Sequence, residues 1–127
     1  MTDHASGPFD VTITPLSKGR FDRMALDKQF HGDLEAVSAG EMMAFQSAAK
    51  GSAGYVAMER VIGTLKGQRG SFVLQHSATM HRGVPEMSIA IVPDSGTDEL
   101  AGISGTMRIL ITDGKHSYEF DYTLAGE

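Results

Sequence analysis

The sequence predicts an all-β fold, a single antiparallel β-sandwich or barrel, and three observations support this prediction. Apolar and polar side chains alternate along most of the chain, as they do in half-buried strands. Glycine-rich turns separate the alternating runs, and the prolines lie at the ends of runs or in turns. A chain of 127 residues suits one domain, here residues 1–127, which can bury roughly two thirds of its unfolded surface. We expect residues 1–7 to form a mobile N-terminus.

The strands are predicted from runs of period two. In chain order these runs are 9–14, 24–31, 55–65, 70–80, 87–91, 107–111 and 116–124. The segment SAGEMMAFQSAAKG, residues 38–51, has two interpretations. Ser38 with Glu41 three residues later is a capping box that favours a helix ending at Gly51, whereas a strand would lead to a hairpin loop near 48–52. We favour the strand.

The register of the last hairpin follows from the sequence. Asp113-Gly114 lies between two alternating runs, which is the strongest short-range hairpin signal. A two-residue turn there predicts five cross-strand pairs: Ile111–His116, Leu110–Ser117, Ile109–Tyr118, Arg108–Glu119 and Met107–Phe120. Opposite charges then face each other on the wetter side of the hairpin, and apolar groups meet on the drier side.

An earlier hairpin joins the runs 55–65 and 70–80 and brings two titratable residues together. A two-residue loop at Gly67-Gln68, with glycine first as a type II′ turn prefers, places Glu59 directly opposite His76. A loop at Gln68-Arg69 places them on a diagonal, still within reach of long side chains. Either register keeps Glu59 and His76 on the apolar face of their strands.

The apolar faces of the runs 24–31, 55–65 and 70–80 each carry one titratable residue near the middle. These residues are Lys28, Glu59 and His76. One interpretation is a buried polar cluster without chemistry, because a carboxylate between a lysine and a histidine satisfies all three groups. The other is a ligand or catalytic pocket, because an eight-stranded barrel can hold one small ligand and a histidine tuned by a carboxylate can move a proton. No catalytic residue is assigned, and His76, Glu59 and Lys28 are the candidates. The candidate ligand-binding residues are Lys28, Phe30, Tyr55, Glu59, Phe72, Leu74, His76, Tyr118 and Tyr122.

Composition argues against several classes of function. The net charge is −5 and no basic face is evident, which disfavours a nucleic-acid partner. The chain has no cysteine, so neither a disulfide framework nor a thiolate metal site is available. His76 and His81 differ in strand parity and would not converge on a metal, so we expect neither metal nor cofactor. No signal peptide or membrane-spanning run is evident, and we expect a soluble, cytoplasmic protein without a membrane partner.

Four segments carry a resemblance to a known family: LDKQFHGDLEAVSAGEM, GSAGYVAMERVIGTLKGQRGSFVLQHSATMHRG, IVPDSGTDELAGISGTM and GKHSYEFDYTL. They resemble a bacterial family catalogued as a domain of unknown function, whose members resemble the allene oxide cyclase-like barrels, a group that includes the plant dirigent proteins. Residues 96–105 are similar to a glycine-spaced hairpin of those barrels. The resemblance implies a single antiparallel β-barrel of about eight strands with a central cavity, often assembled into homo-oligomers. It implies no activity. Allene oxide cyclases act on an unsaturated fatty-acid epoxide, and none of their pocket residues is matched to a position here.

Three functions remain open at this stage. The first is a barrel that binds a small, mostly apolar ligand whose acidic or carbonyl group meets Lys28 and His76. The second is an isomerase or cyclase in which Glu59 orients His76 as acid or base. The third is a structural or interaction module with a filled interior. We rank ligand binding first, and an interior open to solvent distinguishes it from the third function.

Overall fold

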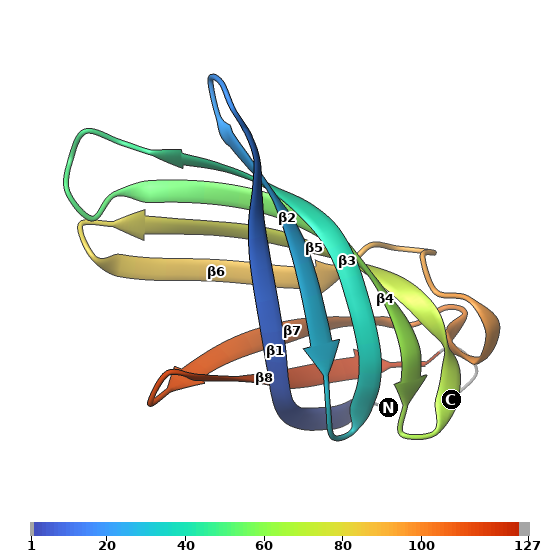
Figure 1. Ribbon diagram of the computed structural model, residues 1–127. Helices are drawn as coiled ribbons and strands as arrows, with labels where there is room; N and C mark the ends of the chain where they lie inside the picture. The colour runs from blue at the N-terminus through green and yellow to red at the C-terminus, as the bar shows by residue number, and fades with distance from the viewer. Residues whose placement is uncertain (1, 125–127) are drawn as a thin grey trace.

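The computed structural model describes residues 2–124, and its eight antiparallel strands close into a barrel in chain order (Figure 1). The elements are β1 (Asp3–Lys18), β2 (Asp22–Phe30), β3 (Leu34–Gln46), β4 (Ala53–Leu65), β5 (Gln68–His81), β6 (Val84–Ile91), the short 3-10 turn η1 (Asp98–Leu100), β7 (Ser104–Thr112) and β8 (Lys115–Thr123). The predicted all-β class and the barrel of about eight strands are confirmed. No helix in the described part of the chain is long and apolar enough to cross a membrane.

The segment with two interpretations is a strand. Residues 34–46 pair with β2 on one side and with β4 on the other, and the chain turns back between Ser47 and Ser52. The two capping-box residues, Ser38 and Glu41, therefore lie in a β-strand and do not cap a helix. Ser38 points into the barrel, where it is buried, and Glu41 points outward to Arg23, which donates a hydrogen bond to it. Two flanking strands that bury alternate residues of β3 override the local helix signal.

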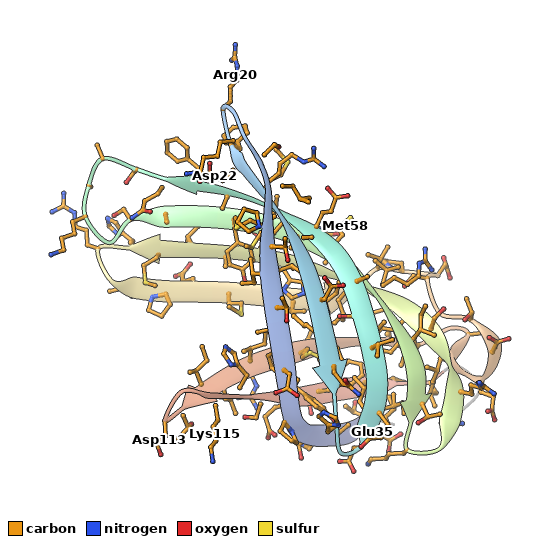
Figure 2. The ribbon with its side chains drawn as sticks, viewed as in Figure 1. Arg20, Asp22, Glu35, Met58, Asp113 and Lys115 are labelled. Atoms are coloured by element: carbon orange, nitrogen blue, oxygen red, sulfur yellow. The ribbon has the colours of Figure 1, made fainter. Side chains whose placement is uncertain are left out.

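The β7–β8 hairpin has the predicted register in all five pairs. Asp113 and Gly114 have φ of 53° and 75°, so the turn has left-handed backbone at both positions, as a type I′ turn requires. This geometry matches the right-handed twist of the flanking strands. In Figure 2, Asp113 and Lys115 lie at the tip of this hairpin, away from the end of the barrel that holds the two termini.

The predicted register of the β4–β5 hairpin is wrong. The two-residue turn is Lys66-Gly67, with φ of 48° and 84°, and Leu65 pairs with Gln68. Glycine takes the second position of a type I′ turn here, whereas the prediction placed it first in a type II′ turn. The register consequently moves by two residues, and His76 lies opposite Ala57. A shift of two preserves the face to which each side chain points, so Glu59 and His76 still share the interior.

Residues 3–7 are not a mobile terminus, contrary to the sequence-based expectation. They form the first part of β1 and pair with β8, from Asp3 opposite Tyr122 to Gly7 opposite Tyr118. Ala5 is fully buried, and the His4 ring contacts Asp121 and Glu119 at 2.8 and 3.2 Å. The hydrogen bond with Asp121 is the main cause of a raised pKa at His4. The strand pairing closes the barrel, which local sequence could not reveal.

One end of the barrel is filled by packed side chains. Its centre is Tyr118, whose hydroxyl donates to the His31 carbonyl at 2.7 Å and accepts from the Leu34 amide at 2.8 Å. The Phe30 ring meets Tyr118 edge-on, with 5.6 Å between centroids. The main core cluster is Ala5, Phe9, Phe30, Leu34, Ala36, Val61, Leu65, Phe72, Leu74, Ile89, Ile91, Leu100, Ile103, Met107, Tyr118, Phe120, Tyr122 and Leu124.

The opposite end of the barrel is open. β6 pairs with β7 only at Ala90 and Thr106, and β1 leaves β8 after Pro8 to pair with β2. The tip of the β7–β8 hairpin therefore diverges from its neighbours on both sides (Figure 1). The apolar stripe of β5 ends at this mouth, because His76 is buried whereas Met80 is 41% exposed.

Candidate ligand-binding site

Four neighbouring strands each send one polar side chain into the barrel at the boundary between the packed end and the mouth. These residues are Lys28 on β2, Ser38 on β3, Glu59 on β4 and His76 on β5, and they are the buried polar or charged residues of the described chain. Ser38 lies directly opposite Lys28, and Glu59 is diagonal to both Ser38 and His76. The predicted convergence of Lys28, Glu59 and His76 therefore takes place, with Ser38 added.

The Glu59 carboxylate is the centre of this cluster. The Lys28 ammonium donates to Oε2 at 2.8 Å, and the Ser38 hydroxyl donates to Oε1 at 2.8 Å. His76 Nε2 lies 2.5 Å from Oε2. The side chain of Glu59 is fully buried, so three neighbours replace the water that its two oxygens would otherwise bind.

The His76–Glu59 contact is short, but its alignment is not that of a hydrogen bond, and Nε2 has no other partner among residues 2–124. An ionised carboxylate can only accept a proton, so we assign the ring proton to Nε2. Nδ1 is then an acceptor when the ring is neutral and a donor when it is cationic.

Glu59 is ionised in spite of its burial. Burial is the largest influence and by itself would raise the pKa of the carboxyl, but the contacts with His76 and Lys28 outweigh it and hold the pKa at about 2. The Lys28 ammonium also lies over two aromatic rings, 5.3 Å from the Phe9 centroid and 5.9 Å from the Phe30 centroid. A negative and a positive charge thus compensate each other inside the barrel.

Gly40 allows β3 to approach β4 closely at Glu59. It lies directly opposite Glu59, and a Cβ at this position would be 2.1 Å from the Met58 carbonyl oxygen and 2.7 Å from the Glu59 Cα. Real Cβ atoms do not approach backbone so closely, so β3 and β4 can curve together here only because residue 40 is glycine.

The cluster borders a cavity at the open end of the barrel. Its volume is about 250 Å³, and its walls are mostly apolar side chains. The lining residues are Phe9, Val11, Ile13, Leu26, Lys28, Met42, Tyr55, His76, Met87, Ile109, Ile111 and His116. Met42, Tyr55 and Met87 also line a second apolar hollow of about 240 Å³, which extends along β3 to β6. A ligand with a polar end at the cluster and an apolar body along these walls fits this shape.

The polar groups of the cavity are mainly hydrogen-bond donors. Glu59 accepts one of the three N–H groups of Lys28, and no acceptor for the other two is found among the described residues. Burial, followed by the charge of Glu59, raises the pKa of the Tyr55 phenol, which is therefore a donor at neutral pH. His116 packs against Phe9 with 5.3 Å between ring centroids. These donors suit an oxygen atom that is negative or partly negative.

The structure divides the predicted ligand-binding residues into two groups. Lys28, Tyr55 and His76 line the cavity, and Glu59 lies behind them. The other five lie in the packed core rather than on the cavity wall: Phe30, Phe72, Leu74, Tyr118 and Tyr122. Parity assigned them to the interior correctly, but parity does not distinguish the filled end of a barrel from the open end.

Sequence reasoning missed Ser38. It has the same signal as the other three residues, since it is a polar residue in the inward stripe of its strand between Ala36 and Gly40. The capping interpretation of 38–51 concealed that signal. The sequence analysis also did not identify Ile109 and Ile111, two aliphatic residues on the β7–β8 hairpin that line the cavity. Only the closure of the barrel brings those residues near β2 and β5.

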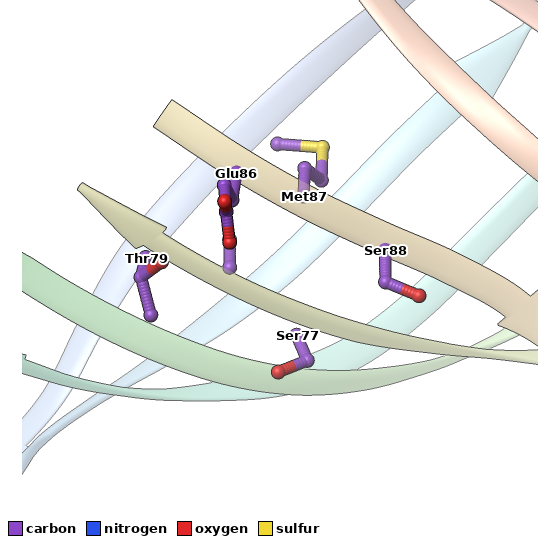
Figure 3. A pocket seen from close by; sticks show the side chains of 6 residues that line it. Ser77, Thr79, Glu86, Met87 and Ser88 are labelled. Carbon is purple, nitrogen blue, oxygen red and sulfur yellow. The ribbon is translucent and has the colours of Figure 1, made fainter. Parts of the chain in front are cut away.

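Not every hollow has this chemistry. The one over β5 and β6 in Figure 3 has a volume of about 530 Å³ and is lined by Ser77, Ala78, Thr79, Glu86, Met87 and Ser88. Its single charged group is exposed, and no buried polar residue borders it. No group of three or more histidine, aspartate or glutamate side chains in the described residues is arranged to hold a metal ion.

Comparison with known proteins identifies the family. The family described as "Protein of unknown function (DUF3224)" matches residues 5–122. The chain belongs to the DUF3224 family. This DUF3224 protein is similar to a crystal structure of a protein with unknown function from the same family of Shewanella oneidensis MR-1. The two are 46% identical, the match covers 100% of both chains, and the TM-score is 0.96. No curated protein matches the chain. The resemblance to a bacterial family of unknown function is thus confirmed, while the likeness to allene oxide cyclase-like barrels stays a prediction.

Proposed function

We propose that this DUF3224 protein binds a small, mostly apolar molecule that carries one acidic or carbonyl group. The observation that supports this is the open cavity of about 250 Å³ with Lys28, Tyr55 and His76 in an otherwise mainly apolar wall. It is larger than the roughly 150 Å³ that holds a benzene ring and close to the lower limit of roughly 300 Å³ for ligand pockets. A structural module with a filled interior has no use for such a cavity.

The polarity of the cavity favours this ligand class. Lys28 and Glu59 compensate each other, so the cluster adds no net negative charge to repel an acidic ligand. The free N–H groups of Lys28 and the Tyr55 hydroxyl would donate to the ligand oxygen. Burial of the apolar part against Met42, Met87 and Ile109 would supply most of the binding free energy, at about 25 cal/mol per Å².

The proposal can be tested with 8-anilinonaphthalene-1-sulfonate, an apolar fluorophore with one anionic group. We expect saturable binding at one site per chain. Lys28→Met should weaken it about tenfold or more, and Tyr55→Phe about fivefold, because each removes a donor to the bound oxygen. Lys115→Met is the matched control, since Lys115 is exposed at the tip of the β7–β8 hairpin. If Lys28→Met does not fold, Tyr55→Phe decides, because it removes only a hydroxyl. Equal affinity in all variants would refute the cavity as the site.

Native mass spectrometry of the freshly purified protein would identify a natural ligand. A small molecule released on denaturation at a fixed ratio to the chain would support the proposal and reveal the ligand's chemistry. A ligand with neither an acidic nor a carbonyl group would contradict the assigned role of Lys28.

The His76–Glu59 contact favours a second candidate, an isomerase or cyclase in which Glu59 orients His76 to transfer a proton. The two functions differ in one experiment. The released ligand is incubated with the protein in D₂O, and deuterium uptake at carbon is followed by mass spectrometry. An enzyme would exchange a carbon-bound proton and would lose this activity in His76→Gln while still binding the ligand. A binding protein would exchange none.

A further inference from the structure

The outer face of β3 and β4 is unusually apolar for a surface. Large apolar side chains that are each about half exposed gather there and at the adjoining β1–β2 turn: Phe21, Val37, Met43, Phe45, Val56, Met58 and Ile62. We call this set the outer patch. Figure 2 shows Met58 on the outer side of these strands, pointing away from the barrel interior. The outer patch therefore lies on the face of these strands opposite to Glu59.

Members of the outer patch are cross-strand neighbours, interrupted once by the pair Ala39–Arg60 between Ile62 and Met58. Val37 lies directly opposite Ile62, and Met43 lies directly opposite Val56. At one end the Phe21 ring meets Phe45 edge-on, with 6.2 Å between centroids. At roughly 100 Å² for each side chain, the outer patch exposes on the order of 700 Å², close to the about 800 Å² that each partner buries in a standard interface. Contiguous patches larger than a few hundred Å² mark interaction sites.

The charged side chains beside the outer patch favour a second copy of this chain as its partner. Arg60 lies on this face beside the Arg23–Glu41 ion pair, so the face carries charges of both signs. A nucleic acid or an anionic membrane would require an excess of positive charge, which neither the outer patch nor the chain, with its net charge of −5, provides. A face that carries both signs can complement itself.

We propose that the outer patch packs against the outer patch of a second copy, around a two-fold axis that runs along the boundary between β3 and β4. β3 of each copy then covers β4 of the other. Val37 faces Ile62 of the second copy, and Phe45 covers Gly54 of the second copy, which has no side chain. Arg60 faces Ala39 of the second copy, within two residues of Glu41 there. The interface is isologous, as two-fold symmetry requires.

The test is the mass of the full-length protein in solution, measured by sedimentation equilibrium over about a hundredfold range of concentration. We expect the wild-type protein to be a dimer. Val56→Lys should weaken association at least tenfold, because it places a charge against Met43 of the second copy within the buried face. Leu110→Lys is the matched control, since Leu110 is similarly exposed on β7, outside the outer patch. Circular dichroism verifies folding, and Ile62→Lys replaces Val56→Lys if the latter does not fold.

A wild-type monomer over the whole concentration range would overturn the proposal. So would a dimer that Leu110→Lys dissociates and the outer-patch variants do not.

Discussion

Replacement of Glu59 by glutamine tests the central electrostatic claim about the barrel interior. Glutamine has nearly the same shape as glutamate and can still accept a hydrogen bond from Ser38 or Lys28, so Glu59→Gln removes the charge and little else. Lys28 is then left as a buried cation with no counter-ion, in a side chain that is only 5% exposed. We expect a large loss of folding stability at neutral pH.

Two independent routes give the magnitude. The pKa of the Glu59 carboxyl falls from 4.5 to about 2 on folding, and at 1.36 kcal/mol per pKa unit this corresponds to about 3 kcal/mol at neutral pH. Removal of one partner from a buried ion pair typically costs about 3–5 kcal/mol. Domains of this size have a total stability of about 5–15 kcal/mol, so the variant should fold but should be much weaker.

The assay is equilibrium urea unfolding of the wild-type and Glu59→Gln proteins between pH 7 and pH 2. Because the folded pKa of Glu59 is lowered, its contribution is complete above pH 4.5 and is lost as the pH falls through about 2. The difference between the two proteins should therefore be constant near neutral pH and should shrink in acid. Glu41→Gln is the control, because Glu41 pairs with Arg23 on the surface and should contribute less than about 1 kcal/mol.

The reasoning is refuted if Glu59→Gln costs no more than Glu41→Gln at pH 7. It is also refuted if the difference between wild type and Glu59→Gln persists unchanged to pH 2, because the effect would then not arise from the Glu59 charge.

Three further outcomes are expected. Gly40→Ala should destabilise the fold by about 1–3 kcal/mol in urea unfolding, because its Cβ would collide with the Met58 carbonyl, and a neutral effect would contradict the close strand approach. The double variant Lys28→Met with Glu59→Leu should lose less stability than Glu59→Gln alone, since it leaves no buried charge unpaired, and a larger loss would count against the ion pair. Burial raises the Tyr118 pKa from 10.0 to about 12, so stability should fall as the pH rises through about 12, and ultraviolet titration against Tyr118→Phe should show no ionisation of this phenol near pH 10.

Local chemistry predicted much of the fold. Alternation of apolar and polar residues located the strands, and Asp113-Gly114 set the register of the last hairpin because a type I′ turn leaves no freedom in the pairing. The interior location of Lys28, Glu59 and His76 also followed, since parity along a strand decides the face to which a side chain points. That prediction survived an error of two residues in the β4–β5 register, because an even shift changes partners but not faces.

Several features depended on contacts between residues far apart in the sequence. The pairing of residues 3–7 with β8 joins the two ends of the chain, and no local pattern encodes it. The strand state of 34–46 was decided by its neighbours β2 and β4 against a helix signal at Ser38.

The sequence by itself determined that Lys28, Glu59 and His76 lie inside an all-β protein, because side-chain alternation is a local property of a strand. Only the tertiary structure decided what surrounds them. β6 and β7 pair only at Ala90 and Thr106, and their separation elsewhere leaves one end of the barrel open. Tyr55 and His76 therefore border a cavity, whereas Phe72 and Tyr118 are packed in the core. Closure and divergence of strands are properties of the whole sheet, and they depend on pairings that no single strand specifies.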